Sequence, residues 1–68
     1  MPRFIITQNF RAFRAAYVGT KERSGIPSRW FDQDLSKARV MDGEEAGEVY
    51  AELTRHGRHD VFQIEEVR

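Results

Sequence analysis

With 68 residues, the chain falls well under the usual size of one domain, so we expect a single domain, residues 1–68, around one hydrophobic core. The composition, 32 % charged and 12 % aromatic, is typical of a globular chain, and the absence of cysteine excludes disulfides and thiolate metal sites and fits a reducing cytoplasm. The formal net charge is zero. No stretch approaches the ~18 apolar residues of a membrane span, and the N-terminus lacks the apolar core of a signal peptide, so no membrane attachment is expected.

The first third of the chain predicts two paired strands. Residues 3–7 contain the β-forming run Phe-Ile-Ile, and Gln8-Asn9 after them is a turn signal. Residues 10–19 fit two patterns, because Phe13 and Tyr17 alternate as in a strand but also have helical spacing behind a possible cap at Asn9. We favour a strand over residues 13–20, since it can pair with the first strand across a short connection.

The middle of the chain predicts a surface loop followed by a short third strand. Residues 21–28 are polar and contain Gly25 and Pro27, which is typical of a mobile loop. Trp30 and Phe31 come next, and they are expected either to anchor this loop on the core or to face a partner. Residues 38–41, with Val40 as their β-branched centre, predict the third strand.

A helix after Asp42 is the clearest element of the sequence. Asp42 is expected to cap its N-terminus, with Glu45 as the capping-box partner. Gly57 is expected to end the helix after a last turn that carries basic residues, and Gly47 to mark a close approach to the sheet. The apolar stripe, with spacings of three and four residues, comprises Ala46, Val49, Tyr50 and Leu53.

Residues 60–67 predict the final strand, in which Phe62 and Ile64 alternate with polar residues. The expected order is strand, strand, strand, helix, strand, which defines an α+β fold: a small antiparallel sheet packed on one amphipathic helix. One helix covers one face of such a sheet, so the other face should stay at least partly open to solvent or to a partner. The expected core residues are Phe4, Ile6, Phe13, Tyr17, Val40, Ala46, Val49, Tyr50, Leu53, Phe62 and Ile64.

The zero net charge hides a division along the chain. Residues 1–39 carry eight basic and three acidic side chains, whereas residues 40–68 carry three basic and eight acidic ones. On the predicted helix, Glu44, Glu48 and Glu52 lie one turn apart and form an acidic stripe. This stripe is either a solvated face or a docking surface for a basic partner.

The opening residues MPRFIIT resemble the start of the tautomerase superfamily. That resemblance implies that Pro2, freed as a secondary amine after removal of Met1, would act as a general base. The family continues its first strand into a long helix, whereas this sequence continues with predicted strands. The alternative interpretation is a proline that is only second in the chain.

Other chemical motifs are weak. His56, His59 and Asp60 have ligand chemistry, but a helix end followed by a turn does not present them on one face. The serines lack a glycine-flanked elbow, and the glycines lack the order of a phosphate loop. The sequence therefore predicts no catalytic, cofactor-binding or metal-binding residue, and no cofactor.

Aromatic side chains lie among the basic residues of the first half, as in proteins that stack single-stranded nucleic acid on aromatic rings. The zero net charge argues against this class, because affinity for a polyanion starts from an excess of cations. Nucleic acid is therefore a less favoured partner than protein.

From Trp30 onward, the string WFDQDLSKARVMDGEEA resembles short, mostly uncharacterised phage and prophage proteins, in which an aromatic precedes a DLSKAR-type segment, a strand, an EEA helix and a last strand. The likeness covers residues 30–67. It implies a small α+β fold and an accessory phage role in a bacterial cytoplasm, and it carries over no catalytic residue. Phage proteins of this size often bind and inhibit a host protein, and anti-CRISPR proteins are examples.

We therefore expect a small binding module without enzymatic activity that acts on a host protein through a charged exposed face. A Pro2-dependent tautomerase and a single-stranded nucleic-acid binder are the alternatives. The sequence leaves the oligomeric state open. The residues expected to contact the partner are Glu44, Glu48, Glu52, Trp30, Phe31 and Arg29.

Overall fold

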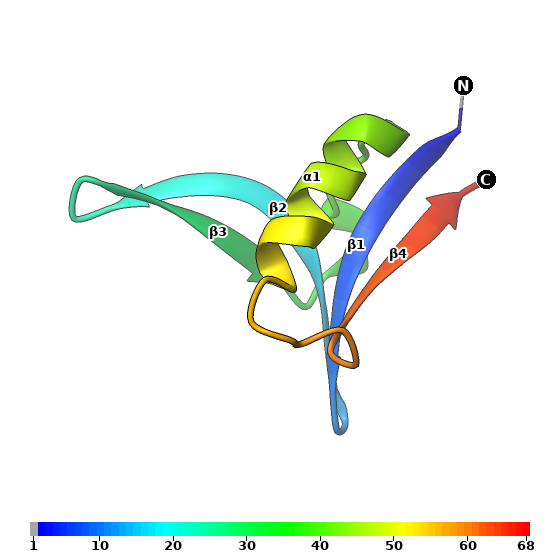
Figure 1. Cartoon of the computed structure of the whole chain (residues 1–68), viewed down its shortest axis with the longest axis horizontal. Helices are drawn as coiled ribbons and strands as arrows, with labels where there is room; N and C mark the ends of the chain where they lie inside the picture. Colours follow the sequence, from blue (N-terminus) through cyan, green and yellow to red (C-terminus); the bar gives the residue numbers. More distant parts are fainter. Residues whose placement is uncertain (1) are drawn as a thin grey trace.

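The fold is a four-stranded antiparallel sheet with one helix across one of its faces (Figure 1). The computed structural model describes residues 2–68, and Met1 lies outside this range. The strands are arranged in the order β3-β2-β1-β4. The elements are β1 (Arg3–Phe10), β2 (Phe13–Arg23), β3 (Ile26–Asp32), the 3₁₀ turn η1 (Leu35–Lys37), α1 (Gly43–Leu53) and β4 (Phe62–Val67). The predicted α+β class and the order of three strands, a helix and a strand are confirmed.

The predicted pairing of the first two strands is confirmed, and the helical alternative for residues 10–19 is wrong. β1 runs three residues further than predicted, because the Gln8-Asn9 signal does not form a turn and lies inside the strand. The turn is made instead by Arg11 and Ala12, between the paired residues Phe10 and Phe13. Arg11 has a φ of 56°, which is uncommon for a residue with a side chain.

The predicted loop over residues 21–28 is wrong, because this segment is the end of a long β-hairpin. Only Ser24 and Gly25 form the turn, and both have positive φ, 52° and 78°. Two central residues with positive φ define the two-residue turn that matches the twist of paired strands. The flanking residues are polar because both faces of the hairpin end are exposed, so they lack the alternation that identifies a strand with one buried face.

The predicted third strand at residues 38–41 is also wrong, since the third strand is β3. Residues 38–41 instead fill a gap where β2 separates from β1. Phe4 and Met41 exchange two backbone hydrogen bonds, of 2.7 and 2.8 Å, and the Arg39 N–H donates to the Tyr17 carbonyl at 2.9 Å. The segment therefore satisfies backbone groups of both strands without forming a strand of its own.

A β-bulge lies where β2 bends away from the sheet. The register shifts between Tyr17 and Gly19, and Gly19 has a φ of 123°, a conformation open to glycine alone. Beyond the bulge, β2 and β3 continue together as a ribbon that extends away from the helix and the other strands (Figure 1). We call residues 20–30 of this ribbon the arm.

The core lies between α1 and the helix-facing side of the sheet. Its buried cluster comprises Ile6, Tyr17, Met41, Ala46 and Val49, with Phe4, Phe31, Tyr50 and Leu53 packed against it. Three predicted core residues are exposed: Phe13 by 43 %, Val40 by 46 % and Ile64 by 40 %. Phe13 lies at the end of a hairpin beyond the helix, Val40 alternates with the inward-facing Met41, and Ile64 is on an edge strand. Met41 and Phe31 were missing from the predicted core.

The N-cap of α1 is as predicted, but the end of the helix is not, and the Glu45 carboxylate accepts from Arg39. The Asp42 side chain accepts the Glu45 N–H at 2.8 Å, which confirms the N-cap. The helix ends at Leu53, because the Arg55 N–H donates to the Glu52 carbonyl, three residues back, and so leaves the helical pattern of bonds. Gly57 (φ 85°) belongs to the following turn, and no basic residue lies in the last helical turn. The predicted close approach at Gly47 is wrong, since no atom lies within 4 Å of the position that its Cβ would take.

Substituting these two glycines separates backbone strain from packing. Gly19→Ala should lower the free energy of unfolding by about 1–3 kcal/mol, because the space around Gly19 is open but its φ disfavours a side chain. The matched variant Gly47→Ala, on the exposed helix, should raise it by about 0.5–1 kcal/mol. Urea unfolding followed by circular dichroism measures both, and equal effects at the two positions would contradict the role given to the bulge.

Candidate functional site

Part of the division of charge along the sequence is resolved by pairing within the fold. Three ion pairs each join an arginine of the basic half to a glutamate of the acidic half: Arg14–Glu65, Arg29–Glu52 and Arg39–Glu45. The strands β2 and β3 carry the first two arginines across to β4 and α1. The charge division therefore stabilises contacts between elements, and only the charges left unpaired are available to a partner.

Arg29 ties the arm to the helix. Its Nε donates to the Glu52 carboxylate at 2.9 Å, Nη2 bonds the same oxygen, and Nη1 donates to the Tyr17 hydroxyl at 2.8 Å. The hydrogen bond from Arg29, reinforced by its charge, lowers the pKa of Glu52, and the same bond raises the pKa of Arg29. The arm is thus held at its base by a polar brace that crosses from β3 to α1.

An open groove of about 420 Å³ lies between the bent part of β2 and the helix. It is lined by Tyr17, Gly19, Thr20, Arg29, Arg39, Glu45, Glu48 and Val49. Its two arginines are paired with helix glutamates, so the groove presents balanced charge. Neither Pro2 nor the two histidines line it.

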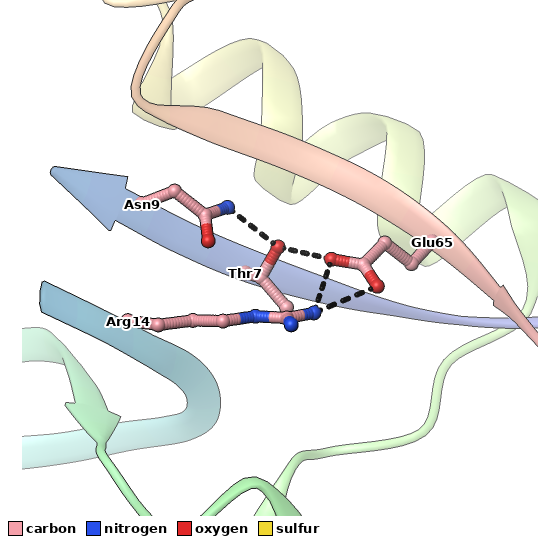
Figure 2. A network of polar contacts seen from close by, with 4 residues as sticks. All are labelled: Thr7, Asn9, Arg14 and Glu65. Atoms are coloured by element: carbon pink, nitrogen blue, oxygen red, sulfur yellow. Dashed lines mark hydrogen bonds and ion pairs between the residues drawn. The ribbon is translucent and has the colours of Figure 1, made fainter. Parts of the chain in front are cut away.

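A second polar network lies on the sheet face opposite the helix and joins three strands (Figure 2). The Thr7 hydroxyl, on β1, donates to Glu65 of β4 at 2.5 Å and accepts from Asn9 at 3.1 Å. Arg14 of β2 donates to both oxygens of the same carboxylate at 3.0 Å. Thr7 has no exposed surface, so this network closes over the body of the sheet and satisfies a buried hydroxyl.

The arm has a face that points away from the helix. Arg29 and Phe31 both contact helix-side residues, so Trp30 between them points to the opposite side. The Lys21 ammonium lies 5.4 Å from the centre of the Trp30 ring and therefore shares this side. Arg23 follows two residues after Lys21, and Ile26 and Ser28 are their direct cross-strand partners. We call Lys21, Arg23, Ile26, Ser28 and Trp30 the arm face.

The arm face combines exposed apolar surface with unpaired positive charge. Ile26 is 65 % exposed and Trp30 37 % exposed. Among residues 2–68, neither Lys21 nor Arg23 forms an ion pair. Asp32, which follows Trp30 by two residues on β3 and so faces the same side, lies 4.0 Å from the Lys37 ammonium.

The structure distributes the six predicted partner-binding residues over three environments. Glu44 and Glu48 are exposed on the helix, whereas Glu52 is engaged by Arg29. Phe31 packs against the core between Tyr17 and Phe62, with ring centres 5.7 Å from each. Trp30 and Arg29 point to opposite sides of β3. The six residues therefore do not form one patch.

Four residues of the arm face were missed because residues 21–28 were interpreted as a loop: Lys21, Arg23, Ile26 and Ser28. The Ser24-Gly25 dipeptide was the available signal, since a two-residue turn of this kind between polar, β-compatible residues is typical of a hairpin. An exposed ribbon has no buried side, so hydrophobic periodicity could not reveal it.

The remaining sequence-based candidates stay apart. Residues 2–68 contain no group of three or more His, Cys, Asp or Glu side chains placed to hold a metal ion. The His59 ring packs near Tyr50, with centres 6.1 Å apart. Pro2 is exposed ahead of β1. Within the described residues, no helix has the length and apolar character needed to cross a membrane.

Comparison with protein-family models, with curated proteins and with solved structures yields no match for this chain.

The Arg29–Glu52 pair should make stability depend on pH in the acid range. Because the folded-state pKa of Glu52 is lowered, its contribution is present above the unfolded pKa and is lost as pH falls through the folded value. Glu52→Gln should cost about 0.2–1 kcal/mol of unfolding free energy at about pH 7, the range of exposed ion pairs, and close to nothing at about pH 2. Urea unfolding at the two pH values measures this, and a cost that does not change with pH would contradict the assignment.

The network in Figure 2 should behave as one coupled unit. Thr7→Val keeps the volume of a fully buried side chain but removes the donor to Glu65, and Glu65→Met removes the acceptor. The coupling energy between the two substitutions should be about 0.5–1.5 kcal/mol. A double-mutant cycle from urea unfolding gives this value, and strictly additive effects would show that the hydrogen bond does not hold β1 to β4.

Proposed function

We propose that this protein is a small binding module that acts by docking on a protein partner, without catalysis. The observation that carries the proposal is the arm, whose residues 20–27 are all exposed and lie outside the core. A two-stranded ribbon alone is marginally stable in water, so an extension of this kind needs dedicated support. The Ser24-Gly25 turn, the Lys21–Trp30 contact and the Arg29 brace supply that support.

The arm also carries residue types that dominate protein interfaces. Tryptophan and arginine are enriched among the residues that contribute most to binding, and exposed apolar side chains next to cations suit a partly polar interface. By contrast, the groove beside the arm presents two arginines already neutralised by glutamates. This balance favours a structural role for the groove over a reaction site.

The finer form of the proposal is an accessory protein of phage or prophage type that binds and inhibits a host protein in the bacterial cytoplasm. Its support is the resemblance of residues 30–67 to short phage proteins. That segment includes Trp30 of the arm face and the helix with Glu44 and Glu48, so the resemblance spans exposed residues as well as core ones.

The Pro2-dependent tautomerase finds less support. An amine that acts as a general base must lie beside a bound substrate, and Pro2 is exposed and does not line the groove. No observation on the fold favours this activity over binding.

Shortening the arm tests the proposed function. Residues 22–27 are replaced by Asn-Gly between Lys21 and Ser28, which lie opposite each other in the register. Because the removed residues are exposed, the shortened chain should keep its circular dichroism spectrum and most of its stability. Affinity capture from a bacterial lysate should retain a protein with the full-length bait that the shortened bait loses, and binding should be reproduced with the purified protein.

Retention of the same proteins by both baits, or of none by the full-length chain, would overturn the proposed function. The chain with Glu44→Lys and Glu48→Lys is the matched control, because it alters the exposed helix and leaves the arm intact. It should retain the same partner as the unmodified chain.

A further inference from the structure

We propose that the arm face binds an acidic, partly apolar segment of a protein, with Trp30 and Ile26 contacting its apolar side chains and Lys21 and Arg23 pairing with its carboxylates. This inference rests on the proposed function and adds the binding surface and the chemistry of the partner. It depends on three features of the arm: charge left unpaired, an accessible tryptophan, and a strand edge that a proline interrupts near the tip.

The charge of the arm face is of one sign. Lys21 and Arg23 form no ion pair among residues 2–68, and Glu22 between them points to the other side of the ribbon. The one cation on the helix side of the arm, Arg29, is neutralised by Glu52. A partner that meets this face therefore gains by presenting carboxylates, and basic partners are disfavoured.

The tryptophan can be exposed at small cost. Lys21 covers part of the Trp30 ring through a cation–π contact, and such contacts at exposed sites contribute only about 0.5–1 kcal/mol. A carboxylate that draws Lys21 aside would leave the ring free to pack on an apolar side chain. Trp30 and the more exposed Ile26 then supply the apolar part of the contact.

The face of the ribbon is better suited to binding than its edge. β3 is an edge strand, and an added strand would need a row of free N–H groups along it. Pro27 supplies no N–H, and a proline paired within a sheet turns its nitrogen to the free edge. Pro27 is the second residue of β3, so the outer edge of the strand lacks an N–H near the tip of the arm, and recognition there should use side chains of the arm face.

The small number of unpaired cations on the arm face favours a protein partner over nucleic acid. Proteins that bind duplex or single strands by electrostatics commonly contact many phosphates, and affinity scales with the number neutralised. The arm face offers two cations, Lys21 and Arg23. Two phosphate contacts would give weak binding, whereas two ion pairs around a packed tryptophan match the usual build of a protein interface.

Selection from an unbiased library of displayed random peptides tests this partner chemistry. The library is panned on the immobilised intact chain and, separately, on the Lys21→Glu/Arg23→Glu chain. Peptides enriched on the intact chain should be rich in Asp and Glu beside aliphatic or aromatic residues, and should not be enriched on the charge-reversed chain. The control Arg58→Glu/Arg68→Glu makes the same change in charge at exposed residues outside the arm and should select the same peptides as the intact chain.

Trp30 is the only tryptophan, so its fluorescence reports directly on the arm face. The most enriched peptide should shift the emission to shorter wavelength, and its dissociation constant should rise about tenfold or more on Lys21→Glu/Arg23→Glu. An oligothymidylate titrated in parallel should cause no saturable change at about 0.15 M salt.

Several outcomes would overturn the inference. These are no enriched peptide, enriched peptides that are basic, equal enrichment on the charge-reversed chain, or saturable binding of the oligothymidylate. Concentration-dependent self-association that is abolished by Glu44→Lys/Glu48→Lys would assign the arm face to a second copy of the chain and would also overturn it. The two proposals can fail separately. If shortening the arm abolishes capture of a host protein and one of these outcomes is also observed, the proposed function stands, whereas the proposed chemistry of the partner is wrong.

Discussion

The separation of β2 from β1 is the constraint on which the rest of the structure depends. The two strands pair only from Thr7 to Phe10, and the backbone groups left free beyond that point need other partners. Residues 39–41 supply them, through the paired hydrogen bonds between Phe4 and Met41 and the bond from Arg39 to Tyr17. The same insertion brings the Met41 side chain into the core. Freed from β1, β2 can bend at Gly19 and carry the arm away from the helix.

The electrostatics follow from this geometry. The bend places Arg29 above Glu52, while Arg39 in the inserted segment reaches Glu45 at the start of α1 and Arg14 reaches Glu65 across β1. A sequence that is basic in one half and acidic in the other thus forms three ion pairs that join its two halves. Among the charges that form no ion pair within residues 2–68 are Lys21 and Arg23 of the arm face and Glu44 and Glu48 of the helix. Part of the charge division that suggested a docking surface in the sequence therefore serves contacts within the fold, and the proposed recognition uses Lys21 and Arg23, which form no ion pair among the described residues.

The arm and the body have different physical requirements. The body is held by an apolar cluster on one side of the sheet and by the Thr7–Glu65–Arg14 network on the other (Figure 2). The arm has no covering layer on either face, so it depends on its turn, on the Lys21–Trp30 contact and on Arg29. Because the exposed arm adds no residues to the buried cluster, its side chains can vary with little effect on folding, which suits a binding surface.

We could predict from the sequence the α+β class, the pairing of the first two strands, the cap at Asp42 and the apolar stripe of α1, because each rests on local turn chemistry or on the periodicity of a half-buried element. Phe4, Ile6, Tyr17 and Phe62 were likewise recognisable as core residues. Three features were visible only in the folded chain: residues 38–41 insert between two strands, Arg29 and Trp30 face opposite sides of β3, and residues 21–28 form a ribbon. These depend on backbone groups and charges that meet across long sequence separations, and an exposed ribbon leaves no hydrophobic pattern from which it could be read.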